Sequence, residues 1–200
     1  MGKPIKSSNL LPSVLMDKLK FIREFFKHWR EVGSVIPSSR WLVGKMLALI
    51  DFEEARVIVE LGPGTGCLTR KLLARMSARS KLLVFEINPD FCRELKKIKD
   101  GRLSVFNVSA LALGDYFRGT KADYVLSGLP LTNLDRKTRT ALLEAVRSVL
   151  HPPGAYIQFQ YSLSARKELQ SVFNQVSIKF TLLNIPPAFV YQCKSHDYLR

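Results

Sequence analysis

Apolar positions follow two different spacings along the chain. Between residues 14 and 32 they recur every three or four residues, as on one face of an α-helix. From residue 56 onwards, short apolar runs typical of buried strands alternate with segments of helical spacing. The predicted strands are 56–61, 81–87, 103–108, 124–127 and 155–161, with two further β-rich runs at 176–183 and 189–193. The predicted helices are 14–32, 40–50, 69–76, 89–98 and 136–150.

This alternation predicts an α/β fold. Strands that alternate with helices form a mostly parallel sheet with helices on both faces, and the two late β-rich runs predict an antiparallel edge strand. We expect a flexible N-terminus at 1–12, an N-terminal segment of amphipathic helices at 13–52, and the sheet domain at 53–200. In such sheets, ligands bind beyond the carboxyl ends of the strands.

The junction after the first predicted strand carries the strongest chemical signal. Glu60 ends an apolar run, and Gly62, Gly64 and Gly66 follow at every second position. Glycines let the backbone turn sharply and approach a ligand closely. A dinucleotide fingerprint requires a further glycine where this chain has Cys67.

The pattern Glu-x-Gly-x-Gly-x-Gly instead resembles motif I of S-adenosylmethionine (SAM) methyltransferases. This resemblance implies the class I, Rossmann-like, doubly wound sheet. Glu86 ends the second strand, 20 residues after Gly66, where a carboxylate can accept both ribose hydroxyls. The predicted SAM-binding residues are Glu60, Gly62, Gly64, Thr65, Gly66, Glu86, Ile87, Ser109 and Ala110.

The charge balance is strongly basic, with 31 Lys and Arg against 17 Asp and Glu, a formal net charge of +14. Such a charge attracts nucleic acid or an anionic membrane surface, or serves solubility alone. Helix 14–32 combines basic and aromatic side chains, so it either packs on the domain, binds a membrane surface, or forms a lid. The predicted membrane-binding residues are Lys18, Lys20, Arg23, Phe25, Phe26, Lys27, Trp29 and Arg30.

The remaining composition is that of an ordinary globular domain. With 200 residues and 46% hydrophobic content, the chain can bury one core. Three cysteines without metal-like spacing favour a reducing compartment, and we expect a cytoplasmic protein without a signal peptide or membrane span. The three histidines show no ligand spacing, so no metal is predicted.

Four segments together resemble the bacterial phospholipid N-methyltransferase family. They are Val32-Gly33-Ser34-Val35-Ile36-Pro37-Ser38-Ser39, the glycine turn 60–66, Ser127-Gly128-Leu129-Pro130-Leu131, and Gln158-Phe159-Gln160-Tyr161 with Asn184-Ile185-Pro186-Pro187-Ala188. The resemblance implies SAM as cofactor, a membrane aminolipid such as phosphatidylethanolamine as substrate, and peripheral association with the inner face of the cell membrane. In one respect the chain departs from the family, which has Gly-Asp-Ala where this chain has Val108-Ser109-Ala110. A serine hydroxyl can accept a hydrogen bond from adenine but carries no charge.

The segment after the fourth strand separates two kinds of substrate. Adenine dimethyltransferases of ribosomal RNA have Asn-Leu-Pro-Tyr there, where the Asn binds the amine and the aromatic ring stacks on the base. This chain has Gly128 and Leu131 at those positions, which favours a flexible amine over a flat base. The predicted catalytic residues are Tyr161, Ser127, Gly128 and Leu129. The predicted substrate-binding residues are Ser38, Ser39, Arg40, Pro130, Tyr191 and Lys194.

Three functions therefore remain open. The first is a membrane-associated aminolipid N-methyltransferase, whose partners are the anionic membrane surface and its lipid substrate rather than nucleic acid. The second is an RNA adenine N-methyltransferase. The third is a noncatalytic peripheral membrane-binding protein, for which Ser109 is the only indication.

Overall fold

The computed structural model describes residues 38–117, 119–182 and 186–195, with only the backbone for residues 38–40. The chain divides into two units, Met1–Ile36 and Pro37–Arg200, and the described residues belong to the second. The predicted flexible N-terminus and the predicted membrane-binding side chains between Lys18 and Arg30 lie outside the described residues.

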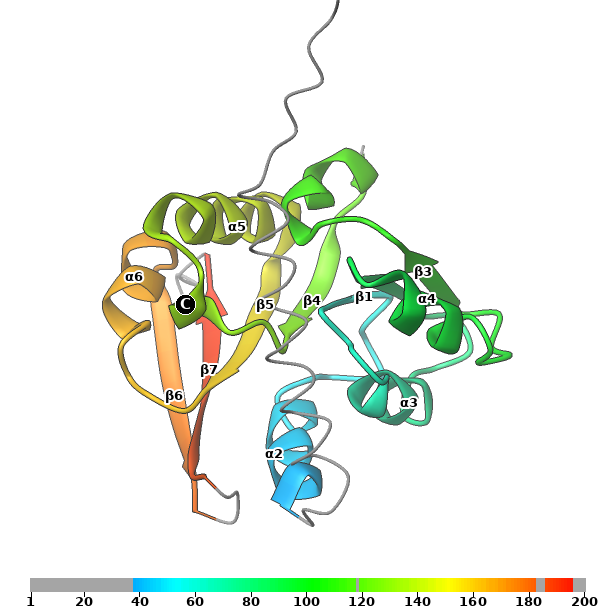
Figure 1. Ribbon diagram of the computed structural model, residues 1–200, viewed down its shortest axis with the longest axis horizontal. Coiled ribbons are helices and arrows are strands. Elements are labelled where there is room, and N and C mark those ends of the chain that lie inside the picture. Colours follow the sequence, from blue (N-terminus) through cyan, green and yellow to red (C-terminus); the bar gives the residue numbers. More distant parts are fainter. Residues whose placement is uncertain (1–37, 118, 183–185, 196–200) are drawn as a thin grey trace, which may run out of the picture. The chain divides into compact units, whose positions relative to one another are not determined.

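The second unit is built on one seven-stranded sheet (Figure 1). Its strands are β1 Val57–Leu61, β2 Lys81–Phe85, β3 Leu103–Phe106, β4 Ala122–Ser127, β5 Leu150–Gln160, β6 Gln175–Thr181 and β7 Ala188–Lys194. The spatial order is β3-β2-β1-β4-β5-β7-β6. The pairs from β3 to β5 are parallel, whereas β7 runs antiparallel to both β5 and β6. The predicted α/β class, with a mostly parallel sheet and an antiparallel addition at one edge, is confirmed.

Helices cover both faces of this sheet. They are α2 Ser38–Leu47, α3 Cys67–Leu73, α4 Pro89–Leu95, α5 Arg136–Val149 and α6 Arg166–Val172, with the 3₁₀ helices η1 Ala110–Tyr116 and η2 Leu131–Asn133. One core cluster contains side chains of α2, α3 and α4, and the other contains side chains of η1, α5 and α6. Successive residues of a strand point to opposite faces, so Ile58 enters the first cluster and Val59 the second. Both are fully buried, which explains the continuous apolar run of β1.

Helix α2 belongs to the sheet domain. Its side chains Leu42, Met46 and Leu47 are buried in the same cluster as the strand residue Ile58. The predicted domain boundary at residue 53 therefore lies too far along the chain, since the compact unit begins at Pro37. The hydrophobic pattern identified the helix but not the surface against which it packs.

Two local features differ from the prediction. Strand β5 begins at Leu150 rather than residue 155, and its register with β4 shifts between Ala122 and Tyr124. Residues 152–154, which separate the predicted helix 136–150 from the predicted strand 155–161, instead form an irregularity inside the strand. There a Cβ on Gly154 would lie 2.6 Å from the Asp123 carbonyl oxygen. Helix α6 was not predicted because it has seven residues and buries only Leu169.

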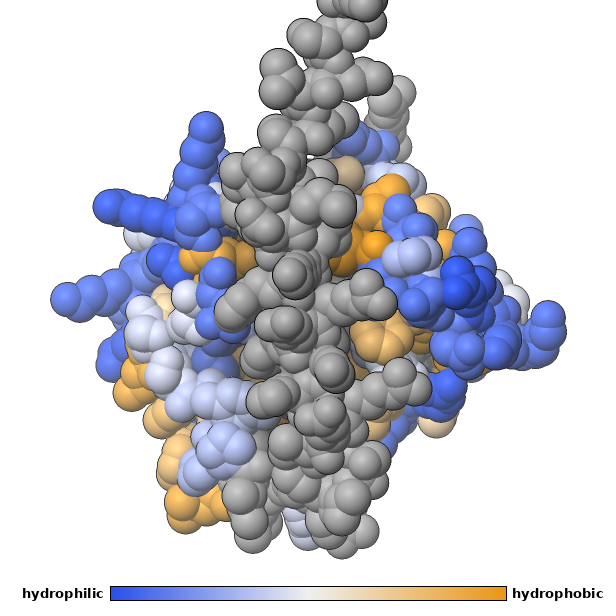
Figure 2. Space-filling view, in the orientation of Figure 1, coloured by the Kyte–Doolittle hydropathy of each residue, from blue (hydrophilic) through white to orange (hydrophobic). Residues whose placement is uncertain are grey.

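The surface in view is largely hydrophilic. Figure 2 shows hydrophilic residues over the α5 and α6 side and over the α4 side of this face. A hydrophobic area lies at the lower end of the β6–β7 hairpin (Figure 2). Phe180 in β6 and Leu182, directly after this strand, are exposed hydrophobic side chains. Within the described ranges, no helix has the length and apolar character needed to cross a bilayer.

Candidate active site

The carboxyl ends of the parallel strands bring the predicted site residues to one edge of the sheet. Leu61 at the end of β1 pairs with Phe85 on one side and Ser127 on the other, and Ser127 pairs with Gln158. The glycine turn, Glu86 and the loop after β4 therefore share this edge. The sequence segments that were predicted separately form one site.

The glycine turn is possible only with glycines at its key positions. Gly62, Gly64 and Gly66 have φ angles of +67°, +55° and +78°, a region that side chains with a Cβ rarely adopt. Space is restricted as well, because a Cβ on Gly62 would lie 2.5 Å from Leu129 Cδ2, and one on Gly66 would lie 2.7 Å from Leu95 Cδ2. The turn thus packs directly against the loop that follows β4.

Glu60 is a buried carboxyl directly before this turn. Its side chain is 1% exposed, and its Oε2 accepts a 2.6 Å hydrogen bond from the Thr69 hydroxyl. Burial raises the pKa of Glu60 to about 8 despite this hydrogen bond, and the charge of Glu86 acts in the same direction as burial. A cation brought next to Glu60 would favour its ionised form.

Glu86 places its carboxylate at the glycine turn. Oε2 accepts a hydrogen bond from the Gly64 N–H at 3.2 Å, and Oε1 accepts one from the Asn88 N–H at 2.8 Å. Burial raises the pKa of Glu86 as well. The positions of Glu86 and the three glycines fit a ligand with a sugar diol near β2 and a zwitterionic amino-acid end near β1, as in SAM.

Asn107 was not predicted as part of the site. Its Nδ2 donates hydrogen bonds to the carbonyl oxygens of Glu86 and Ile87, at 2.9 and 3.1 Å. The Cys92 thiol also donates to the Glu86 carbonyl, at 3.3 Å. These contacts fix the backbone that presents the Glu86 side chain. The sequence signal was weak, because Asn107 fell inside the predicted strand 103–108, whereas β3 ends at Phe106 and Asn107 directly follows it.

The remaining predicted cofactor residues lie at the same edge. The Ser109 side chain caps η1 by accepting a 3.2 Å hydrogen bond from Leu111 N–H, and Ala110 is the first residue of η1. The Thr65 carbonyl accepts a hydrogen bond from Arg70.

The loop after β4 is fixed by buried polar groups. The Gly128 N–H donates to the Leu61 carbonyl at 3.2 Å, which ties this loop to β1. Leu129 N–H donates to Ser127 Oγ at 3.1 Å, and the Leu129 carbonyl accepts from the side-chain amides of Gln158 and Gln160. The two glutamines belong to a predicted family segment, but their contacts with Leu129 were not predicted.

Tyr161 lies just beyond β5 at the same edge. Its side chain is 38% exposed, and its ring packs edge-on against Phe159 with centroids 5.8 Å apart. Phe159 in turn lies 3.7 Å from the position of a Cβ on Gly128. Tyr161 is therefore a neighbour of the strand-four loop and is partly accessible from outside.

The predicted substrate-binding residues are divided by the fold. Pro130 directly precedes η2 at the site. Ser38, Ser39 and Arg40 are the first residues of α2, and the structure describes only their backbone. Tyr191 is fully buried and donates a 3.0 Å hydrogen bond to the Ser162 carbonyl, so the prediction that it anchors a substrate is wrong.

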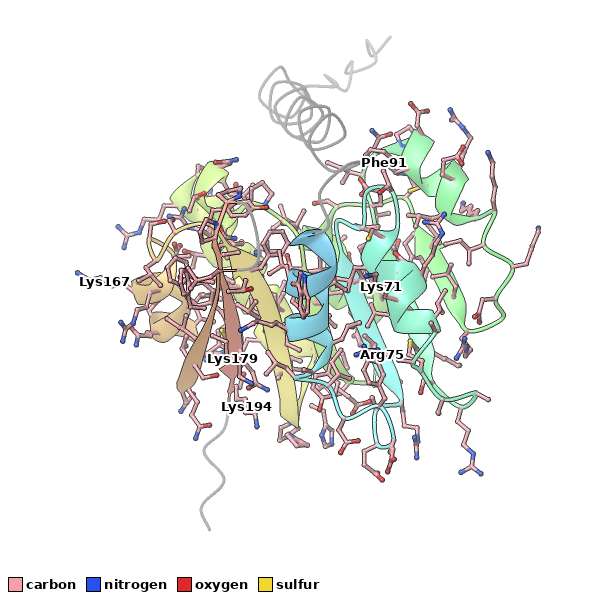
Figure 3. The ribbon with its side chains drawn as sticks, turned by 90° about the horizontal axis from the view of Figure 1, so that it is seen from below. Lys71, Arg75, Phe91, Lys167, Lys179 and Lys194 are labelled. Atoms are coloured by element: carbon pink, nitrogen blue, oxygen red, sulfur yellow. The ribbon has the colours of Figure 1, made fainter. Side chains whose placement is uncertain are left out.

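The prediction for Lys194 is also wrong. Because β7 is antiparallel, Lys194 pairs with Gln175 at the start of β6, at the opposite edge of the sheet from the glycine turn. Figure 3 shows Lys194 in the lower part of the sheet domain and Phe91, from the first turn of α4, in its upper part.

No group of three or more potential metal ligands occurs among the His, Cys, Asp and Glu residues that the structure describes. The polar groups described at this edge are the two carboxyl groups of Glu60 and Glu86, backbone amides, neutral side chains and the Arg70 guanidinium.

Comparisons with known proteins give the family. A family model described as ribosomal RNA adenine dimethylase matches residues 27–116, which include the glycine turn and end before the strand-four loop. An ornithine lipid N-methyltransferase of Singulisphaera acidiphila is 33% identical over 187 residues, covering 90% of this chain and 97% of the relative. Ribosomal RNA small subunit methyltransferase A of Mycoplasma capricolum is 31% identical over only 84 residues, or 42% of this chain and 30% of that protein.

Solved structures support the fold. The 1,6-didemethyltoxoflavin-N1-methyltransferase of Burkholderia thailandensis, with bound S-adenosylhomocysteine, superposes with a TM-score of 0.69 at 12% identity, over 97% of this chain and 94% of that one. The N-methyltransferase NodS of Bradyrhizobium japonicum, also with S-adenosylhomocysteine, gives 0.64 at 13% identity, over 82% and 90%.

The predicted class I methyltransferase fold and the predicted SAM cofactor are thus confirmed, and the protein is a SAM-dependent N-methyltransferase. With 33% identity along nearly the whole of both chains, this protein belongs to the bacterial aminolipid N-methyltransferase family.

Proposed function

We propose that this protein transfers methyl groups from SAM to the primary amine of a membrane aminolipid, such as ornithine lipid or phosphatidylethanolamine, at the membrane surface. One observation carries the choice of acceptor. In the strand-four loop, Gly128 and Leu131 occupy the positions of the Asn and the aromatic residue in adenine dimethyltransferases. Leu131 is 0% exposed and packs in the core, so it does not offer a surface for stacking on a base.

With a lipid amine as acceptor, the residues of the site have separate roles. SAM supplies an electrophilic methyl group when it is bound. The glycine turn and Glu86 hold the cofactor, and Glu60 lies beside the turn as a carboxyl that a nearby cation would ionise. An alkyl amine with a pKa of roughly 10 has to lose a proton before it can attack a methyl group. The residues of the strand-four loop would orient this amine, and Tyr161 would orient it further or accept its proton.

Membrane association is the second part of the proposal. The net charge of +14 favours an anionic surface, and the basic aromatic segment 14–32 supplies an apolar contribution. We propose that the protein is cytoplasmic and binds the inner face of the cell membrane peripherally. Sedimentation with anionic and neutral vesicles tests this, since equal binding to both would contradict the electrostatic contribution.

The test of the activity uses the full chain with methyl-labelled SAM. Vesicles that contain ornithine lipid, vesicles that contain phosphatidylethanolamine, and unmodified ribosomal RNA are offered in separate reactions. Glu86→Ala, at a SAM concentration below its raised Kd, is the control of reduced activity. We expect label in lipid and none in RNA. Transfer to RNA alone would overturn the proposal, and transfer to neither would favour a noncatalytic membrane-binding protein.

RNA adenine methylation is the second candidate. The match of residues 27–116 to the ribosomal RNA adenine dimethylase model and the basic charge both favour it. That match lies on the cofactor half of the protein, which a lipid and an RNA enzyme would share. The acceptor half, beyond residue 116, is the part that differs.

A further inference from the structure

A group of buried polar side chains lies beneath the strand-four loop. Ser127, Tyr156 and Gln158 are all 0% exposed, and Gln160 is 5% exposed. Polar groups this deeply buried are almost always hydrogen-bonded, because an unpaired one loses its contacts with water and gains nothing in return. Their partners therefore indicate what the group holds in place.

The hydrogen bonds form a ring of groups around Leu129. Leu129 N–H donates to Ser127 Oγ at 3.1 Å. The Ser127 side chain lies close enough to the Tyr156 hydroxyl to lower its pKa in part, against the larger effect of burial. The Tyr156 hydroxyl donates to Gln158 Oε1 at 2.6 Å, and Gln158 Nε2 donates back to the Leu129 carbonyl at 2.9 Å. One residue of the loop is thus held by both its N–H and its C=O.

The ring has a single stable pattern of donors and acceptors. Gln158 Nε2 uses its second hydrogen on the Phe159 carbonyl at 2.7 Å, so the amide of Gln158 cannot be flipped without losing hydrogen bonds. Burial raises the pKa of the Tyr156 hydroxyl, which therefore remains a donor. The Tyr156 ring stacks on Phe173 at 5.7 Å, which fixes the position of the hydroxyl.

The Leu129 carbonyl has no capacity left for a substrate. It accepts one amide hydrogen bond from Gln158 and a second, at 3.3 Å, from Gln160, and a carbonyl oxygen has two lone pairs. A hydrogen bond from the acceptor amine therefore has to go to another group of the loop.

Peptide geometry points to the Gly128 carbonyl. In a trans peptide the C=O of one residue and the N–H of the next point in opposite directions. Because Leu129 N–H points to the buried Ser127 Oγ, the Gly128 C=O is directed away from the ring. Gly128 itself lies against the glycine turn, since a Cβ on it would be 3.5 Å from the Gly62 carbonyl oxygen and 3.7 Å from Phe159 Cε1.

We propose that Tyr156, Gln158 and Gln160 are positioning residues that saturate Leu129 and present the Gly128 carbonyl as the hydrogen-bond acceptor for the substrate amine. This inference rests on the proposed transfer to an amine. It explains why a strand that is otherwise apolar on this face carries two glutamines. A neutral carbonyl orients the amine without a charge that would stabilise its unreactive ammonium form.

The first experiment measures the loop without any substrate. Amide hydrogen exchange of Leu129 is followed by NMR in the full chain and in the Gln158→Met and Tyr156→Phe variants. We expect exchange at Leu129 to be about tenfold faster or more in both variants, since each opens the ring. Gln192→Met, in the neighbouring strand and outside the ring, is the matched control and should leave this exchange unchanged.

The second experiment measures catalysis with SAM and an aminolipid in vesicles. We expect Gln158→Met to lower kcat about tenfold or more, with the Kd for SAM within about twofold of that of the unmodified protein. In Gln158→Glu, the ratio of kcat to that of the unmodified protein should rise as the pH is lowered, because a protonated carboxyl can again donate to the Leu129 carbonyl. A merely structural role would not produce this pH profile.

Different results would overturn different parts of the proposal. Unchanged Leu129 exchange in Gln158→Met and Tyr156→Phe would overturn the ring, and an unchanged kcat would overturn its role in positioning. If Gln158→Met does not fold, Tyr156→Phe and Gln160→Met carry the same test. If the unmodified protein methylates no aminolipid, the proposed function fails, and the role of Gly128 fails with it, whatever the exchange rates show.

Discussion

The two halves of the carboxyl edge use different chemistry. At the ends of β1 and β2, two buried carboxyl groups, Glu60 and Glu86, have raised pKa values and surround a turn of glycines. At the ends of β4 and β5, the polar groups are hydroxyls and amides from Ser127, Tyr156 and Gln158. The first half responds to a nearby positive charge, whereas these three side chains of the second half are uncharged.

This difference matches the two partners of a methyl transfer. A cofactor with a sulfonium and an ammonium group is favoured by carboxylates that ionise as it binds. An amine acceptor has the opposite need, since a carboxylate beside it would raise its pKa and keep it protonated. Neutral carbonyl and amide groups leave the amine free to lose its proton. In the proposed function, the acceptor half therefore depends on holding no carboxylate beside the amine as well as on its hydroxyl and amide groups.

The largest effect is expected where the two halves touch. Gly62→Ala places a methyl group 2.5 Å from Leu129 Cδ2 at a φ of +67°, so both the glycine turn and the strand-four loop must move. We expect SAM affinity and kcat each to fall by about a hundredfold or more, from roughly 3 kcal/mol of combined strain and lost contacts. Calorimetric titration with SAM and the methylation assay measure the two separately.

Gly44→Ala is the matched control for this substitution. A Cβ on Gly44 meets no atom within 4 Å, and the residue lies inside α2. The control should keep full activity and gain about 0.5–1 kcal/mol of stability from the higher helix propensity of alanine. Loss of activity in both variants would contradict the tight fit that is argued for Gly62.

The next largest effect is expected for Glu86→Ala, which should weaken the binding of SAM and leave the binding of the aminolipid nearly unchanged. Glu86→Ala removes the carboxylate at the glycine turn, and we expect the Kd for SAM to rise about 10- to 100-fold, the worth of charge-assisted hydrogen bonds. The KM for the aminolipid at saturating SAM should change by less than about threefold. Equal changes in both constants would mean that the two halves do not act independently.

The sequence predicted the cofactor half better than the acceptor half for a physical reason. The glycine turn and Glu86 are local signals, because strand ends, glycines and carboxylates occur at fixed spacing within 27 residues of Glu60. Gln158 acts on Leu129, 29 residues earlier in the chain, and only the pairing of β4 with β5 brings the two together. The sequence shows Gln158 and Gln160 as polar residues at every second position of an apolar strand. It does not show that both bind the Leu129 carbonyl.

Strand direction explains the errors at β7. The sequence predicted an antiparallel run in this part of the chain. Because β7 is antiparallel to β5, the carboxyl end of β7, with Lys194, lies at the edge where the parallel strands begin. Tyr191 faces the core because β7 is an internal strand between β5 and β6, not an edge strand. Both errors come from the order of the strands, which hydrophobic pattern alone does not determine.

Glu60 provides a test of the carboxyl half through pH. Burial raises the pKa of its carboxyl from 4.5 to about 8 in the folded protein. Between these two pH values the folded state therefore keeps a proton that the unfolded state has lost. Stability therefore falls as the pH rises from 4.5 to about 8, by up to about 1.4 kcal/mol per pH unit. Glu60→Gln cannot ionise, so we expect it to flatten this slope and to melt several degrees higher than the unmodified protein at pH 8.

Thermal melts between pH 5 and pH 8.5 measure this slope, and SAM titrations at the same pH values measure the linked binding. In the unmodified protein we expect SAM affinity to increase several-fold with pH, as Glu60 ionises, and in Glu60→Gln to change less. A parallel pH dependence of both proteins would place the ionising group elsewhere.

The smallest effect is expected at the outer rim of the acceptor half. Tyr161→Phe removes a hydroxyl from a side chain that is 38% exposed, while the ring can keep its edge-on contact with Phe159. Water can replace an exposed hydroxyl in part, so we expect kcat to fall only about three- to tenfold, with the Kd for SAM unchanged. A shift of the pH profile of kcat would indicate that Tyr161 accepts the proton of the amine, and a uniform decrease would indicate that it orients the amine. If kcat keeps its full value, the neutral ring around Leu129 and the Gly128 carbonyl are sufficient to position the acceptor, and Tyr161 has no part in the reaction.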